Sequence, residues 1–177
     1  WQRALALLGE MWATKLKPDA ISYGAAIFSC AAGMQWKLAQ SLLSEMWLAK
    51  LVPDVLSYNA GISACEKGMC WQQALCLLGE MCDEEIERGI VSYSAAISAC
   101  EKGRQWQQAL WLLREMKEAA PKCMNTISYN AAISGCQKGG QWQQALWLLR
   151  QARTGLEPNT ISYSAGMSAC EKGGQWQ

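Results

Sequence analysis

The sequence predicts an all-α fold in which helix–turn–helix repeats of about 35 residues stack into an α-α superhelix, or solenoid. Three markers recur in one register. A Ser-Tyr pair occurs at Ser22-Tyr23, Ser57-Tyr58, Ser92-Tyr93, Ser128-Tyr129 and Ser162-Tyr163. Tryptophan recurs at Trp1, Trp36, Trp71, Trp106, Trp142 and Trp176, and cysteine at Cys30, Cys65, Cys100, Cys136 and Cys170. Agreement between three separate residue types establishes the repeat.

The markers divide residues 1–177 into one array. Four whole repeats span 20–54, 55–89, 90–125 and 126–159, residues 1–19 form the second half of an earlier repeat, and 160–177 the first part of a later one. Because the pattern is cut within a repeat at both ends, we expect this chain to be a fragment of a longer array, so the lack of a targeting segment carries no weight.

Each repeat contains two helices with one apolar face each. In the second repeat, Tyr58, Ile62 and Cys65 share a face of the first helix, and Gly68 lies where that helix should end. The second helix has an apolar face of Trp71, Ala74, Leu75, Leu78 and Met81. We therefore expect the tryptophan, alanine and leucine columns to form the core.

The joints between repeats carry helix-capping residues. Asp19, Asp54 and Asn159 each follow a proline and are natural N-caps of the next helix. No run of alternating apolar and polar residues predicts a strand.

Composition excludes several classes of function. Lys and Arg number 16 against 15 Asp and Glu, so bulk charge cannot drive nucleic-acid binding. Histidine is absent, which removes the commonest general base and metal ligand. With no phosphate-binding loop or nucleophile elbow either, the chain is not expected to be an enzyme or to hold a cofactor. No apolar stretch is long enough for a membrane span, so no membrane partner is expected.

Cysteines raise two further alternatives. Equivalent cysteines in adjacent repeats are about 10 Å apart, too far for a disulfide ladder, so we interpret them as small buried residues of a reducing compartment. A zinc site around Cys65, Cys70, Cys76 and Cys82 is disfavoured, because no Cys-x-x-Cys pair exists and the four span two helices. No metal is expected.

The repeat resembles one family more than another. Tetratricopeptide repeats place Trp-x-x-Leu-Gly-x-x-Tyr early in their first helix, whereas here tryptophan opens the second, as in Trp106-Gln107-Gln108-Ala109-Leu110. The string Thr126-Ile127-Ser128-Tyr129-Asn130-Ala131-Ala132-Ile133, with Ala145-Leu146 and Glu157-Pro158-Asn159, resembles the pentatricopeptide repeat of the P type over essentially the whole chain. The resemblance implies single-stranded RNA as partner, one base per repeat, in organellar RNA processing or stability in a mitochondrion or plastid.

The resemblance also assigns roles to three columns. The residue after each tyrosine and the last residue of each repeat would read a base: Gly24 with Asp54, Asn59 with Gly89, Ser94 with Asn125, Asn130 with Asn159, and Ser164. An apolar residue two places before the tyrosine would stack between bases: Ile21, Leu56, Val91, Ile127 and Ile161. A lysine at the end of the first helix would contact phosphate: Lys67, Lys102, Lys138 and Lys172, with Ala32 in the first repeat.

Structural explanations compete in each column. The residue after the tyrosine varies among Gly, Asn and Ser, which are poor helix formers with short polar ends, while its neighbours barely change. That variation favours base reading over a merely crowded helix position. Helix capping competes at the last residue, core packing explains the apolar column equally well, and the helix dipole favours lysine at a C-terminus.

The family's pairings, carried over, give a partial code. Ser94 with Asn125 implies adenine, and Asn130 with Asn159 implies a pyrimidine. The pairs Gly24 with Asp54 and Asn59 with Gly89 depart from the recognised ones, and one residue is inserted in 90–125. We therefore expect weak specificity. The main alternative is a tetratricopeptide-like scaffold that binds a protein, and self-association through the uncapped ends is also open.

Overall fold

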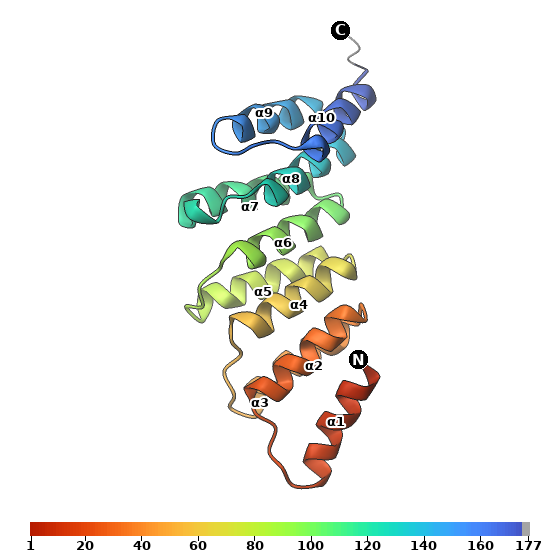
Figure 1. Cartoon of the computed structure of the whole chain (residues 1–177), viewed down its shortest axis with the longest axis vertical. Coiled ribbons are helices and arrows are strands. Elements are labelled where there is room, and N and C mark those ends of the chain that lie inside the picture. Colours follow the sequence, from red (N-terminus) through yellow and green to blue (C-terminus); the bar gives the residue numbers. More distant parts are fainter. Residues whose placement is uncertain (175–177) are drawn as a thin grey trace. The chain divides into compact units, whose positions relative to one another are not determined.

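The computed structural model describes residues 1–174, so the marker Trp176 and the end of the partial repeat lie outside the described residues. The described chain is helical and contains no strand (Figure 1). Its elements are α1 (Gln2–Ala13), α2 (Ala20–Ala32), α3 (Trp36–Leu48), α4 (Val55–Lys67), α5 (Trp71–Asp83), α6 (Ile90–Lys102), α7 (Trp106–Ala119), a 3₁₀ helix η1 (Pro121–Cys123), α8 (Thr126–Lys138), α9 (Trp142–Arg153) and α10 (Thr160–Lys172). None of these helices is long and apolar enough to cross a membrane.

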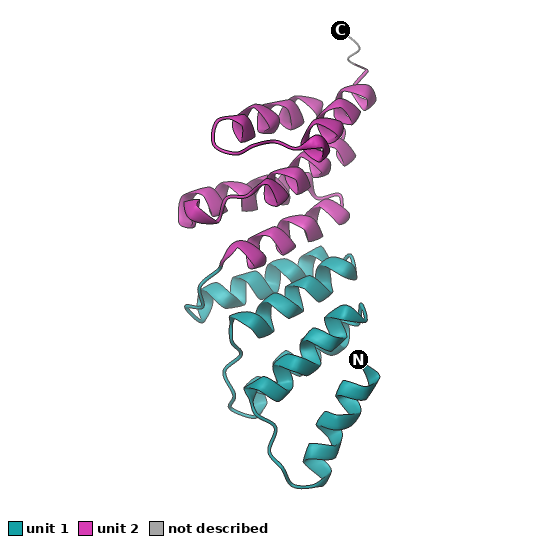
Figure 2. Ribbon diagram, in the orientation of Figure 1, with its two compact units in different colours: residues 1–88 teal, residues 89–177 magenta. Residues whose placement is uncertain are grey.

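The helices form two compact units, residues 1–88 and the residues from Gly89 onward (Figure 2). In the first unit α2 packs beside α4, and α3 packs against both. In the second unit α6, α8 and α10 pack in succession, while α7 packs against α6 and α8, and α9 against α8 and α10. Within each unit, therefore, the first helices of the repeats lie side by side and the second helices cover them, which confirms the predicted all-α stacked-repeat class.

The core lies between these two sets of helices. Tyr58, Ile62 and Cys65 are fully buried, as predicted, and Ala74 and Met81 meet them from the second helix. Burial raises the pKa of the thiols of Cys65 and Cys100 to about 12 and that of Cys136 to about 11. These thiols stay protonated at neutral pH and act as small apolar groups, and every cysteine of the chain is free.

The tryptophan column packs differently from the prediction. Trp36, Trp71, Trp106 and Trp142 are half-buried and Trp1 is exposed. The rings of Trp1, Trp36, Trp106 and Trp142 lie on the glycine that ends the first helix of the repeat that follows. A Cβ on Gly68 would stand 2.3 Å from Trp36 Cδ1, and one on Gly139 would stand 2.3 Å from Trp106 Cδ1. The tryptophans thus connect adjacent repeats within a unit at the helix ends.

The same contact explains the glycines. Gly68 has φ −79°, so it does not adopt the left-handed conformation expected of a C-terminal glycine. The left-handed residue is the next one, Met69 with φ 56°, and Gly140 with φ 72° in a later repeat. The helix ends at Gly68 as predicted, and the approach of the indole explains why this position is a glycine.

Helix capping follows the prediction. The side chains of Asp19, Asp54 and Asn159 accept a hydrogen bond from the backbone N–H three residues later, at 2.9, 2.9 and 3.1 Å. The Ser22 hydroxyl also donates to Asp19, which lowers the pKa of that carboxyl. The inserted residue of 90–125 is absorbed by the 14-residue α7 and by η1, and Asn125 still caps α8.

Candidate nucleic-acid interface

A column of apolar side chains is exposed on the first helices. It consists of the second residue of each: Ile21 (80% exposed), Leu56 (74%), Val91 (53%), Ile127 (64%) and Ile161 (62%). From the sequence alone, core packing explains these apolar residues as well as ligand contact does. Their exposure in the structure excludes core packing. Exposed β-branched and leucine side chains at one position per repeat are available to contact a ligand in each unit.

The two predicted base-reading residues of repeat 126–159 are joined by a hydrogen bond between their side chains. Asn130 Nδ2 on α8 donates to Oδ1 of Asn159, the N-cap of α10, at 3.1 Å. A third residue completes the cluster: the buried Ser162 donates its hydroxyl proton to Asn130 Oδ1 and accepts the Asn159 backbone N–H at 3.1 Å. The structure thus brings together two side chains that are 29 residues apart in the sequence.

The equivalent residues of repeat 90–125 are not joined in this way. Ser94 Oγ donates to the carbonyl oxygen of Ile90 in its own helix, at 2.6 Å. Asn125 caps α8, accepting the Ser128 backbone N–H at 2.8 Å and donating to the Cys123 carbonyl at 3.2 Å. The Ser128 hydroxyl is buried without a hydrogen-bond partner.

The first unit shows a third arrangement. Gly24 has no side chain, and a Cβ built on it would stand 3.5 Å from Ser57 Oγ. Ser57 instead donates its hydroxyl to Asp54 at 2.7 Å. Here the carboxylate that caps the helix also takes the serine proton, so the repeat 20–54 offers a bare backbone beside an anionic side chain.

The remaining predicted base-reading residues are Asn59, Gly89 and Ser164. Asn59 is half-buried on α4 in the first unit, and Gly89 is the N-cap of α6 in the second, without a side chain to cap it. Ser164 on α10 bonds to the carbonyl of Ile161 in its own helix, at 3.0 Å. The Gly89 backbone N–H donates to the Ser92 hydroxyl at 3.3 Å.

The lysine column lies at the ends of the first helices, and one of its members forms an ion pair with a carboxylate. Lys67, Lys102, Lys138 and Lys172 are the last residues of α4, α6, α8 and α10, and all are exposed. Lys138 Nζ is 2.5 Å from Glu101 Oε1 on the neighbouring α6, and Ser134 also donates to that carboxylate at 2.8 Å. Sequence reasoning missed this partner, although glutamate directly precedes lysine at Glu66, Glu101 and Glu171.

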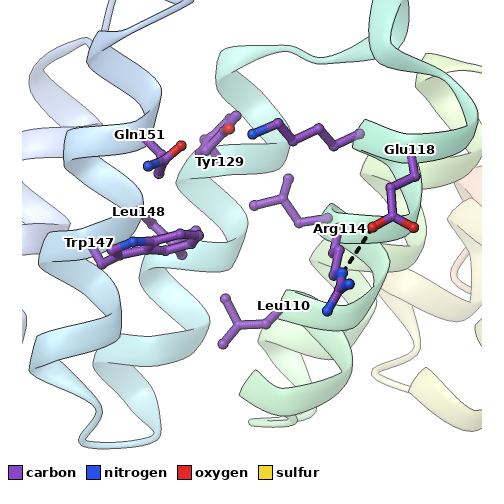
Figure 3. Close-up of a pocket in the computed structure, with 9 residues that line it drawn as sticks. Leu110, Arg114, Glu118, Tyr129, Trp147, Leu148 and Gln151 are labelled. Atoms are coloured by element: carbon purple, nitrogen blue, oxygen red, sulfur yellow. Dashed lines mark hydrogen bonds and ion pairs between the residues drawn. The ribbon is translucent and has the colours of Figure 1, made fainter.

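A separate pocket of about 640 Å³ lies among α7, α8 and α9 (Figure 3). Leu110, Trp147, Leu148 and Tyr129 supply apolar surface, and Arg114 and Glu118 form an exposed ion pair at 2.9 Å beside it. None of the predicted site residues lines this pocket, and most of its lining belongs to second helices. Within residues 1–174 no group of three or more Cys, Asp or Glu side chains is placed to hold a metal ion.

Family models describe most of this chain. One for the PPR repeat matches residues 91–119 and 127–154, and one for the pentatricopeptide repeat domain matches 6–67. The chain belongs to the pentatricopeptide-repeat family. No curated protein matches its sequence.

Solved structures agree on the fold of the family. The crystal structure of the pentatricopeptide repeat protein PPR10 in complex with an 18-nucleotide psaJ RNA element superposes with a TM-score of 0.82 at 24% identity, covering 98% of this chain and 25% of that one. The crystal structure of PPR10 from maize gives 0.59 at 18% identity, covering 99% and 35%. This chain therefore spans about a quarter of the length of the RNA-bound PPR10 chain.

Proposed function

We propose that this chain binds single-stranded RNA on the face of its first helices and selects bases through side-chain pairs, one pair per repeat. The observation that carries the proposal is the hydrogen-bonded pair of Asn130 and Asn159. Ile127 and Ile161 lie at equivalent positions on adjacent helices, and both are exposed. Packed helices are about 8–10 Å apart, so an unstacked base fits between these two side chains with its edge toward the pair.

The pair offers hydrogen-bond donors. Asn130 Oδ1 accepts the Ser162 proton, and one Nδ2 proton of Asn130 goes to Asn159. The second Nδ2 proton of Asn130 and the Nδ2 group of Asn159 have no partner among residues 1–174. Both pyrimidines carry a carbonyl oxygen at position 2, which accepts such donors. This chemistry supports the pyrimidine that the family pairing implies, while adenine at repeat 90–125 rests on that pairing alone.

Electrostatics supports affinity of modest size. The chain is nearly neutral, with 16 basic and 15 acidic residues, and the Lys138 charge is shared with Glu101. Phosphate contacts from the lysine column would add a salt-dependent, sequence-independent term of about 0.7 in the logarithmic salt slope per contact. Base contacts and stacking must supply the rest of the affinity.

The biological setting follows the family. The RNA-bound PPR10 structures support RNA as the partner, and we propose a role in organellar RNA processing or stability, in a mitochondrion or plastid. Because only two repeats carry informative pairs, this chain by itself should discriminate weakly.

The test is binding of the chain to short RNAs that contain an adenine–pyrimidine step, measured by fluorescence anisotropy across a salt series. Asn130→Asp replaces the donor amide by a carboxylate, and Gln143→Glu adds the same charge to an exposed site on α9, among the second helices. We expect Asn130→Asp to change the base preference and Gln143→Glu to leave it intact. Equal binding of all RNAs would reduce the function to salt-dependent attraction, and no binding by folded protein would favour a protein-binding scaffold.

A further inference from the structure

The serine three residues into α10 has a place in the site that neither the family pairing nor the sequence markers give it. Ser162 is 1% exposed, so it cannot touch an RNA base itself. Its hydroxyl is nevertheless bonded on both sides: it accepts the backbone N–H of Asn159 at 3.1 Å and donates to Asn130 Oδ1. The two members of the proposed reading pair therefore meet on one buried hydroxyl group.

The direction of these bonds fixes the orientation of the amide. A hydroxyl has one proton, and two oxygens lie within its reach: Asn159 Oδ1 at 3.2 Å and the amide oxygen of Asn130, which is much closer. The shorter contact assigns the proton to Asn130. With its oxygen held inward, Asn130 must direct its Nδ2 group toward Asn159 and solvent. If the amide were rotated by half a turn, its oxygen would face Asn159 Oδ1, two acceptors in contact, and the pair would present an acceptor instead of a donor.

We infer that Ser162 is a positioning residue, which holds Asn130 as a hydrogen-bond donor and so sets the base preference of repeat 126–159. The inference rests on the proposed base-reading function and adds to it that the selecting pair is a triad, whose third member belongs to the following repeat.

The neighbouring repeat supplies an independent observation. Ser128 occupies the same place in α8, and its buried hydroxyl has no partner, because Ser94 is too short a side chain and bonds to its own helix. Buried hydroxyl groups without a partner are uncommon and unfavourable. Ser128 is thus a positioning serine without an amide to hold, and Ser94→Asn would provide one.

The experiment compares affinities for two RNAs that differ only in a pyrimidine or a purine at the base facing repeat 126–159. For wild type we expect a preference of about tenfold. Ser162→Ala should bring the ratio close to one while leaving discrimination at the adenine position unchanged, and Ser162→Thr, which keeps the hydroxyl, should restore it. In NMR spectra the Asn130 side-chain amide signals should shift in Ser162→Ala and stay in Ser162→Thr.

Two controls separate the possible failures. If Asn130→Ala leaves the ratio unchanged, base reading by this pair is wrong and the proposed function fails. If Asn130→Ala abolishes the preference but Ser162→Ala only lowers the melting temperature and weakens both RNAs equally, Ser162 is merely structural and this inference alone is overturned.

A second arm avoids changing α10. Ser94→Asn should create a pyrimidine preference at repeat 90–125, and Ser94→Asn combined with Ser128→Ala should show a much smaller one. Equal preferences in the single and double variants would overturn a positioning role for the serine column.

Discussion

Repeats 90–125 and 126–159 share a backbone plan and differ in one hydrogen-bond network. In both, an asparagine caps the following helix, and a buried serine lies three residues further on. In 126–159 that serine holds Asn130, which in turn bonds to Asn159. In 90–125 the residue after the tyrosine is Ser94, which bonds to its own helix and leaves Ser128 without a partner.

The difference shows that the cap and the selecting side chain are separable. Asn125 and Asn159 cap their helices equally well, with bonds of 2.8 and 3.1 Å to the backbone. Only the second is also bonded to the residue after the tyrosine. Helix capping therefore explains why an asparagine ends the repeat, while under the proposed base reading the variable residue decides what that asparagine presents to RNA.

The largest effect is expected from Asn130→Asp. The substitution replaces two N–H donors by acceptors and places a carboxylate against Asn159 Oδ1, so the pyrimidine preference should disappear. Loss of one well-aligned base contact is worth about 1–3 kcal/mol. Anisotropy titrations with pyrimidine and purine RNAs measure it, and a variant with the wild-type ratio would contradict base reading at this repeat.

The next largest effect is expected at the contact between Trp106 of repeat 90–125 and Gly139 of repeat 126–159. Gly139→Ala places a Cβ where Trp106 Cδ1 stands 2.3 Å away, so the indole must move. We expect a loss of about 1–3 kcal/mol in the free energy of unfolding. Gly79→Ala, on an exposed site inside α5 with no atom within 4 Å, should instead stabilise the chain by about 0.5–1 kcal/mol. Urea unfolding of both variants measures these free energies and should show a loss for Gly139→Ala and a gain for Gly79→Ala.

The serines should respond unequally to the same truncation. Ser162→Ala removes a hydroxyl that is bonded on two sides and should cost about 1–2 kcal/mol in unfolding free energy. Ser128→Ala removes a buried hydroxyl without a partner and should be neutral or slightly stabilising. Equal losses in thermal unfolding would mean that the two repeats do not differ as described.

The smallest effect concerns the ion pair between the same two repeats. Glu101→Gln removes the carboxylate beside Lys138 and leaves its ammonium available to phosphate. Partly exposed ion pairs are worth about 0.2–1 kcal/mol, so we expect RNA binding to tighten by about twofold to fivefold at low salt and to become more salt-dependent. Unchanged affinity in a salt titration would place Lys138 away from the RNA path.

Most of the fold could be predicted from the sequence, because three markers at one period leave few ways to stack the helices. The exposure of the apolar column could be predicted as well, although core packing was a competing explanation of these residues. Residues two apart on a helix differ by about 200°, so Ile127 must face away from the buried Tyr129. The role of glycine at Gly68 was harder to predict, because it depends on an indole that arrives from the preceding repeat.

The triad could not be predicted from residue types alone. Ser162 belongs to the most regular marker of the sequence, the Ser-Tyr pair, and regularity indicates only that the position is constrained. Its bond to Asn130 forms only because the asparagine 32 residues earlier has a side chain long enough to reach the Ser162 hydroxyl. In the preceding repeat the shorter side chain of Ser94 does not reach the equivalent hydroxyl of Ser128. Hydrogen bonds between helices depend on such distances, which a repeat pattern does not encode.

We propose that the Asn130–Asn159 pair selects a base. The most direct measurement is the ratio of dissociation constants for two RNAs that differ only at the base facing repeat 126–159, one carrying a pyrimidine and the other a purine. We expect the pyrimidine RNA to bind about tenfold more tightly, and the ratio to fall close to one in Asn130→Ala. A wild-type ratio of one, from folded protein that binds both RNAs, would contradict it.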